Sequence, residues 1–208
     1  WGKKQMPYYN EIAHTPLFIW DPRYRVAGEH RRSLVQMIDW MPTILQYFGV
    51  PIPKDVQGTP IDRILTEDIP SRDYAMYGVF SGHVNITDGR YAYMRAPVPE
   101  KKDEVYNYTL MPTHMTARFS PEELSTAILE KPFSFTKGCP VLKVKSKDKY
   151  NVAHFGTRLY DLEADPTEST PIRDPGQEER MIRLMERAMA ENDCPPEQFD
   201  RLGLRRPE

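Results

Sequence analysis

The order of apolar and polar positions divides the chain into an α/β first part and a β-rich second part. The run PLFIWDP (16–22) is a short apolar stretch bounded by prolines, a pattern typical of a strand buried on both faces, as in a parallel sheet. Residues 39–49 then show a helical pattern, in which Asp39 can cap the helix and Gly49 can end it. Since a strand that leads into a helix is an α/β signature, this part predicts the α/β class.

The pattern changes to short β-rich runs beyond residue 66. Residues 73–95 contain three such runs, and Asp88-Gly89 between the last two is a strong hairpin signal. The run TRLYDLEADPTES (157–169) predicts one more strand, which ends in an acidic turn. Together these runs predict an antiparallel sheet.

Two helical patterns follow the β-rich runs. Within the loop-rich residues 97–157, Ser120 and Glu123 have the spacing of a capping box. Near the C-terminus, an apolar stripe predicts a helix from about Gln177 to Glu191, and we expect the stripe to pack into the core. The stripe consists of Met181, Ile182, Leu184, Met185, Ala188 and Met189.

Composition excludes two classes of partner. The chain has 208 residues, of which 39% are hydrophobic and 28% are charged, and its formal net charge is -2. Because there is no basic excess, we expect no nucleic-acid partner. No apolar stretch approaches the roughly 20 residues that span a bilayer, so we expect no membrane partner. The first residue is tryptophan and no signal-peptide pattern follows it, so we expect residue 1 to be a cut point.

Cysteine and histidine positions predict no local metal site. Cys139 and Cys194 lie far apart and fit no metal-ligand spacing, so free thiols are favoured over a single disulfide. The five histidines form no paired motif. A G-x-S-x-G nucleophile motif and a glycine-rich phosphate loop are also absent from the sequence.

Two lysines near the start of the chain are candidates for anion binding. Lys3 and Lys4 follow Gly2, and a lysine on a tight loop beside a sheet edge suits an anionic oxygen of sulfate or phosphate. The alternative is a solvated pair of charges on a loop, and the residues alone favour that alternative.

The first part of the chain carries a series of short motifs in a fixed order: Gly2-Lys3, Tyr9-Asn10-Glu11, Pro16-Leu17, Asp39 with Pro42-Thr43, Gly49-Val50 and Gln57-Gly58. The later runs are VNITDGRYAYMR and LYDLEADPTE. In this order the motifs and runs resemble the C-terminal part of a sulfatase of the alkaline-phosphatase-like superfamily, and the resemblance covers nearly the whole chain.

The resemblance implies a fold and two regions. The expected fold is α/β: the C-terminal part of an alkaline-phosphatase-like sandwich, followed by a small antiparallel sheet packed with a C-terminal helix. Residues 1–66 are expected to end the main α/β sulfatase domain. Residues 67–208 are expected to form a C-terminal subdomain with the antiparallel sheet and the amphipathic helix.

The resemblance also implies a sulfatase activity for the intact protein. Sulfatases use a formylglycine, made from the Cys or Ser of a C/S-x-P-x-R motif, and a divalent cation, usually calcium. Cys194 in CPPEQ lacks the arginine and Cys139 lacks the proline two residues later. We therefore expect both cofactors, with the metal ligands, in a missing N-terminal sulfatase portion, and we expect this chain alone to be inactive.

Three residues are assigned to the site by the resemblance. Lys3 takes the place of the family lysine that reaches the sulfate, which makes it the catalytic candidate, and Lys4 is the alternative at that place. Both are expected to bind substrate. His83, on the turn before the run VNITDG, is expected to contact substrate, with a surface turn residue as the alternative. No metal ligand is expected in this segment.

The expected partners are a sulfated small-molecule or carbohydrate substrate and the missing N-terminal sulfatase portion. Association with further copies of the same chain, as a homo-oligomer, is left open. Two other functions stay open. One is a phosphonate or phosphate ester hydrolase on the same scaffold, because tetrahedral anions of similar size suit the same lysine. The other is a non-catalytic domain.

Overall fold

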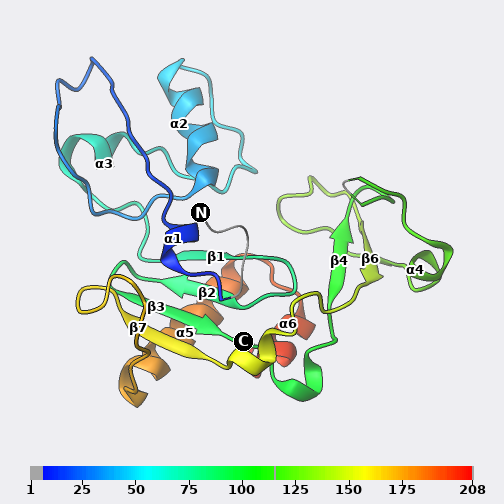
Figure 1. Ribbon diagram of the computed structural model, residues 1–208. Coiled ribbons are helices and arrows are strands. Elements are labelled where there is room, and N and C mark those ends of the chain that lie inside the picture. Colours follow the sequence, from blue (N-terminus) through cyan, green and yellow to red (C-terminus); the bar gives the residue numbers. More distant parts are fainter. Residues whose placement is uncertain (1–6, 115, 208) are drawn as a thin grey trace.

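The structure is a computed structural model that describes residues 7–114 and 116–207, and Figure 1 labels its elements. The helices are α1 (Asn10–Ala13), α2 (Trp40–Tyr47), α3 (Asp62–Glu67), α4 (Pro121–Ser125), α5 (Pro175–Glu191) and α6 (Pro196–Leu202). Short 3-10 helices are η1 (Met37–Asp39), η2 (Pro99–Lys101) and η3 (Val152–Phe155). The strands are β1 (Ala75–Gly78), β2 (Val84–Thr87), β3 (Tyr91–Arg95), β4 (Tyr106–Thr109), β5 (Ile128–Glu130), β6 (Val141–Lys145) and β7 (Arg158–Asp161).

The strands form two antiparallel sheets. One has four strands in the order β1-β2-β3-β7, and the other has three in the order β4-β6-β5. The predicted hairpin joins β2 and β3, where Thr87 pairs with Ala92. The carboxylate of Asp88 accepts hydrogen bonds from the backbone N–H of Arg90 and Tyr91, at 3.0 and 2.7 Å, and so fixes the turn. The predicted antiparallel sheet and its hairpin are confirmed.

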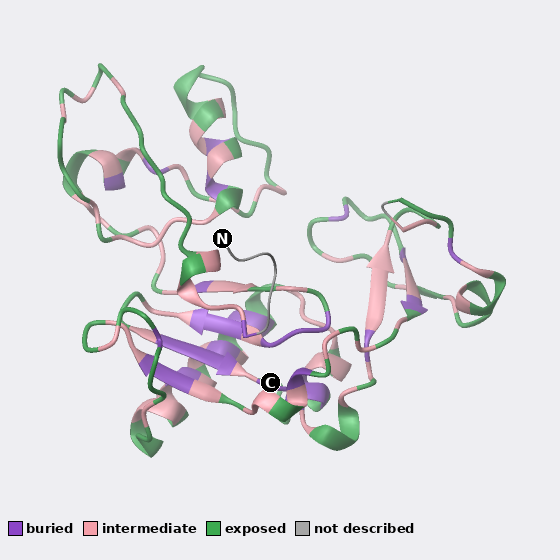
Figure 2. Cartoon of the chain, viewed as in Figure 1, coloured by how far each residue is buried: buried purple, intermediate pink, exposed green. Residues whose placement is uncertain are grey.

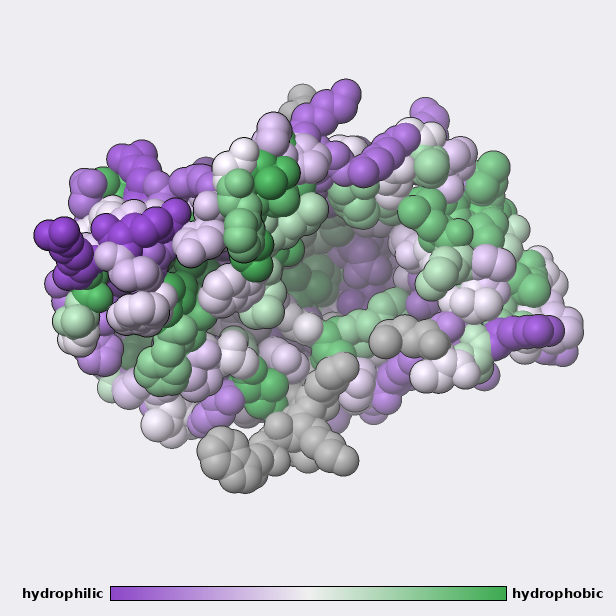
Figure 3. All heavy atoms as spheres, turned by 90° about the horizontal axis from the view of Figure 1, so that it is seen from above, coloured by the Kyte–Doolittle hydropathy of each residue, from purple (hydrophilic) through white to green (hydrophobic). Residues whose placement is uncertain are grey.

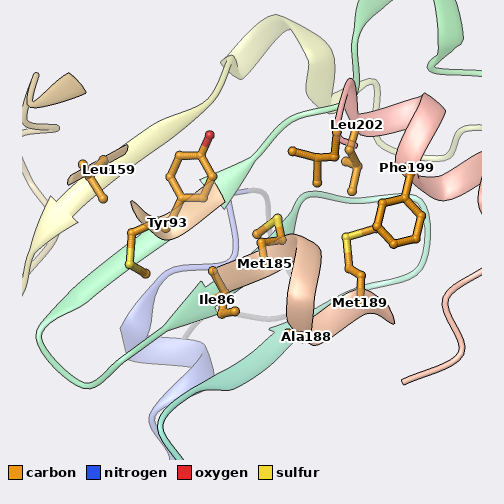
Figure 4. Close-up of a cluster of buried hydrophobic side chains, with 10 residues drawn as sticks. Ile86, Tyr93, Leu159, Met185, Ala188, Met189, Phe199 and Leu202 are labelled. Carbon is orange, nitrogen blue, oxygen red and sulfur yellow. The ribbon is translucent and has the colours of Figure 1, made fainter. Parts of the chain in front are cut away.

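The main core lies between the four-stranded sheet and the C-terminal helices. Alternate strand residues such as Ile86 and Tyr93 point toward α5, where Met185 and Met189 are buried, and Phe199 of α6 closes the cluster (Figure 4). The periods of the strand and of the helix therefore bring their apolar sides together. The expectation that the methionine stripe packs into the core is confirmed, and with it the small sheet covered by a C-terminal helix.

The opposite face of the same sheet is also buried near its centre. Ala92, Met94 and Tyr160 form a second cluster, against which Tyr9 and Leu162 pack. The segment that leads into α1 therefore covers the sheet face that α5 leaves free (Figure 1).

The strand predicted over residues 16–22 is not formed. Residues 15–21 have no regular secondary structure, and the side chains of Phe18 and Trp20 are 91% and 81% exposed. A strand needs a neighbour for its backbone N–H and C=O groups, and none of the strands in the described residues pairs with this run. The sequence pattern correctly indicated an apolar segment, but the prediction that this segment is a strand is wrong.

The predicted helix after Asp39 is present as α2, and Gly49 follows it with a φ of 67°. The predicted cap is wrong: Asp39 makes no capping bond to α2, and its buried carboxylate instead accepts from the backbone N–H of Gln36 and Thr59. The apolar side of α2 is exposed, and residues 14–60 are mostly exposed or half-buried, in contrast to the sheet and α5 (Figure 2).

The smaller sheet lies beside the main one and carries α4 (Figure 1). The predicted capping box opens α4: the Ser120 side chain accepts from the Glu123 N–H at 3.2 Å, and the Glu123 carboxylate accepts from the Ser120 N–H at 2.8 Å. Across the part of the chain that the structure describes, no helix is both long enough and apolar enough to cross a membrane.

Candidate functional site

The two candidate lysines, Lys3 and Lys4, lie outside the described residues. The segment that follows them is described from Pro7 onward and crosses the sheet face opposite α5. The ring of Tyr9 meets Tyr160 edge to face, with 6.2 Å between centroids, and Tyr8 lies 6.4 Å from Tyr77. The chain that leads away from the lysines is therefore packed on the four-stranded sheet.

A guanidinium group fixes the second tyrosine of this segment. Arg158 of β7 donates from Nη1 to the hydroxyl of Tyr9 at 2.5 Å and to the hydroxyl of Tyr160 at 3.4 Å. Burial raises the pKa of Tyr160 to about 12, so this phenol stays protonated at neutral pH. The two hydroxyls and the guanidinium form one polar group on this face of the sheet.

A buried carboxylate fixes the start of α1. Glu168 lies in the turn after β7 with a φ of 53°, and its Oε2 accepts from the backbone N–H of Asn10 at 2.5 Å. Its Oε1 is buried and has no hydrogen-bond partner. Burial, together with the nearby charges of Glu11 and Asp165, raises the pKa of Glu168, and the bond from Asn10 opposes that shift.

The third candidate, His83, directly precedes β2 and is 1% exposed. Its Nε2 lies 3.0 Å from the backbone oxygen of Gly156, and its ring lies 6.4 Å from that of Phe155. Its Nδ1 is buried without a partner. Burial lowers the pKa of His83, so the ring is neutral at pH 7. The structure gives this side chain a place inside the fold, and its contact with substrate stays a prediction.

Asn85, two residues further on, carries a second buried polar group. Its side chain is fully buried, and neither its oxygen nor its nitrogen has a hydrogen-bond partner. Since unpaired buried amides are costly, they are uncommon in native proteins. His83 and Asn85 are separated by two positions of an extended segment, which places both on the sheet face that also carries Tyr9.

Two cavities adjoin these elements. One, of about 240 Å³, is smaller than the roughly 300 Å³ at which ligand pockets begin; its lining includes the buried Arg201, which donates to the backbone oxygen of Ser81 at 2.9 Å. The other, of about 790 Å³, is an open groove that includes Arg158, Arg173 and Glu178 in its lining. Figure 3 shows that the surface is hollowed between apolar and polar side chains.

The described residues offer no metal centre, and the Cys194 thiol is not activated. In residues 7–114 and 116–207, no group of three or more His, Cys, Asp or Glu side chains can hold a metal ion. Cys139 and Cys194 are free, as predicted. Burial raises the pKa of Cys194 to about 12, so this group is a neutral thiol and a poor nucleophile.

Sequence reasoning missed Arg158 and Glu168. Their partners, Tyr9 and Asn10, lie 149 and 158 residues away, a separation that no local pattern reveals. The signal available was indirect: both residues belong to the run TRLYDLEADPTES, and Tyr9-Asn10 belongs to the first motif group.

Comparisons with known proteins find a family match for the first part of the chain. A family model described as N-sulphoglucosamine sulphohydrolase, C-terminal, matches residues 1–130. No curated protein matches the chain. Among solved structures, the chain is similar to BT4656 in complex with its substrate D-glucosamine-2-N,6-O-disulfate, with 17% identity and a TM-score of 0.42 over 76% of this chain and 25% of that one.

A second solved structure belongs to a Bacteroides thetaiotaomicron locus for the metabolism of multiple glycosaminoglycans. It has 15% identity and a TM-score of 0.41, over 77% of this chain and 25% of that one. This chain thus spans about a quarter of the length of both structures.

Proposed function

The chain belongs to the N-sulphoglucosamine sulphohydrolase C-terminal family, as a C-terminal sulfatase portion, and we propose that the intact protein hydrolyses sulfate esters. The observation that carries this proposal is the family match over residues 1–130, which include both candidate lysines. The proposed substrate is a sulfated small molecule or carbohydrate. The description of the family favours a sulfated amino sugar among these.

We assign the sulfate-facing role to Lys3, with Lys4 as the alternative. An ammonium group beside the sulfate balances the charge that develops as the S–O bond breaks. What supports this assignment is the path of the following segment, which is held on the sheet through Tyr9 and Asn10. His83 keeps its proposed role at the substrate; as a neutral imidazole it would contribute a hydrogen bond instead of a charge.

The exposed apolar residues support a contact with an N-terminal sulfatase portion. Twelve of the nineteen large hydrophobic side chains exposed in the described residues lie between residues 17 and 52. Apolar patches of this extent mark surfaces that become buried against another part of a protein. We propose that Phe18, Trp20 and the apolar side of α2 pack on that portion.

The formylglycine and the calcium ion are proposed to belong to the same N-terminal portion. In the described residues no cluster of His, Cys, Asp and Glu fits the cation, and the buried, neutral Cys194 does not fit a cysteine-derived nucleophile. The formylglycine supplies the nucleophile and the cation polarises the sulfate oxygens in this chemistry. The proposed role of the residues of this chain is to bind the substrate and to balance the charge that develops on the sulfate.

The test is sulfate release by the intact protein. The full-length protein is incubated with glucosamine 6-O-sulfate, which carries a sulfate ester, with N-sulfoglucosamine, whose sulfo group is bound to nitrogen, and with glucosamine 6-phosphate. Free sulfate and phosphate are measured by ion chromatography. We expect sulfate release from the 6-O-sulfate ester, and none from residues 1–208 alone with calcium added. Phosphate release without sulfate release would instead support the phosphate ester hydrolase.

A further inference from the structure

We propose that Glu168 and Arg158 are positioning residues, which hold Tyr8–Asn10 on the sheet and thereby fix where the preceding lysines reach the sulfate. This inference rests on the proposed function, since it concerns the same lysines.

The turn that presents Glu168 is itself rigid. The backbone N–H of Glu168 donates to the backbone oxygen of Asp165 at 3.1 Å, and the Asp165 carboxylate accepts from the Thr170 N–H at 2.8 Å. Glu168 has a left-handed backbone conformation, which is unfavourable for a residue with a side chain. A strained residue that is held in place by its surroundings is typical of a position whose side chain must point in one direction.

The contact of Glu168 supplies what α1 lacks. The N-terminal N–H groups of a helix have no partner within the helix, and Tyr9 at the N-cap provides no side-chain bond. The Glu168 carboxylate takes the Asn10 N–H at 2.5 Å from the far end of the chain. The bond therefore satisfies a helix N–H group that α1 itself leaves without a partner.

Arg158 adds a second attachment at the adjacent residue. Its Nη1 donates to the Tyr9 hydroxyl at 2.5 Å, while the ring of Tyr9 packs on Tyr160. Both attachments start from β7 and its following turn, and so they fix two consecutive residues of the segment against one strand. Rotation about either contact is blocked by the other.

Fixing the segment limits where the lysines can go. Four residues lie between Lys3 and Tyr8, so the two Cα atoms are at most about 18 Å apart. If Tyr8–Asn10 were released from the sheet, the lysines would be joined to it by a longer free segment. Displacement of a positioned group by about 1 Å can lower the rate on the order of 100-fold. The Asn10 N–H needs an acceptor at the position of Oε2, and a neutral amide oxygen can also accept there.

The experiment compares Glu168→Ala, Glu168→Gln and Tyr9→Phe in the full-length protein, with Glu163→Ala as the matched control. Glu163 lies in the same turn region, but its side chain is exposed. Two quantities are measured for each variant: amide hydrogen exchange of residues 7–13, and kcat and KM for the sulfated sugar that the wild type hydrolyses.

We expect Glu168→Ala to accelerate exchange in residues 7–13 and to lower kcat by roughly 10- to 100-fold, with a smaller change in KM. Tyr9→Phe should do the same to a lesser degree. Glu168→Gln keeps an acceptor and should restore both quantities, and Glu163→Ala should change neither.

Unchanged exchange in Glu168→Ala, or faster exchange with unchanged kcat, overturns the inference. If Glu168→Ala fails to fold, Tyr9→Phe decides by the same two quantities. A wild type that releases no sulfate refutes the proposed function instead, and the exchange result then still reports on the attachment.

Discussion

The carboxylate of Asp39 forms an ion pair with the guanidinium of Arg72, and it does so where it is fully buried. The same carboxylate accepts from Gln36 and Thr59, at 2.8 and 2.9 Å, and Arg72 also donates to the Gln36 side chain at 2.6 Å. Two separate stretches of the N-terminal part, around residues 36–39 and at Thr59, are thereby tied to the segment that enters β1.

This arrangement predicts that Asp39→Asn destabilises the protein by about 3 kcal/mol, because breaking a buried pair leaves one charge uncompensated. Urea denaturation of the wild type and the variant measures the loss. Glu179→Gln removes an exposed pair with Arg183 and should change stability little. Equal effects of the two substitutions would contradict the structural role of Asp39.

A second prediction concerns Gly58, which belongs to the Gln57-Gly58 motif. A Cβ atom at this position would lie 1.9 Å from the backbone oxygen of Ile38, a distance that no side chain tolerates. Gly58→Ala must therefore push apart two backbone segments, at a cost of about 1–3 kcal/mol or more.

Gly176→Ala is the matched control for this glycine. Gly176 lies in the first turn of α5, where the nearest atom to an added Cβ is 3.4 Å away, and alanine favours a helix by up to about 1 kcal/mol over glycine. Thermal unfolding should show opposite signs for the two substitutions. A stable Gly58→Ala variant would mean that Ile38 and Gly58 are not in contact.

Local and periodic signals explain which parts of the fold were predictable. The hairpin at Asp88-Gly89 needs only its own turn residues, and the stripe of α5 needs only the helical period, so both were correct. The capping box of α4 is likewise a spacing of three residues.

The failures have a common physical cause, which is dependence on distant partners. The apolar run at residues 16–22 has the composition of a buried strand, but the described chain gives it no neighbour. Asp39 was predicted to cap a helix. Its oxygens instead accept hydrogen bonds from the backbone of Gln36 and Thr59 and form an ion pair with Arg72. For the site, the sequence drew attention to His83 but not to Gly156, which binds it from 73 residues away.

The role proposed for Lys3 gives a kinetic prediction. In the intact protein, Lys3→Ala should lower kcat by roughly 100-fold or more, the size seen when one donor to a developing charge is removed. Lys147→Ala, at an exposed lysine, should leave kcat unchanged. An unaffected Lys3→Ala variant would transfer the role to Lys4, and a loss shared with Lys147→Ala would point to net charge instead.

His83 predicts a pH dependence of stability with a definite sign. Burial lowers the pKa of its ring in the folded state, so between that value and the usual value of about 6.5 the unfolded chain binds more protons than the folded one. Stability contributed by the neutral ring is therefore present above about pH 6.5 and falls as the pH drops toward the folded-state pKa, with a slope of at most about 1.4 kcal/mol per pH unit.

His83→Gln does not titrate and should show a shallower decline in unfolding free energy between about pH 7 and pH 5. The exposed His14, changed to Gln, should leave the slope as in the wild type. If His83→Gln keeps the full slope, another group carries the acid sensitivity, and the ring is not held neutral by its burial beside Phe155 and Gly156.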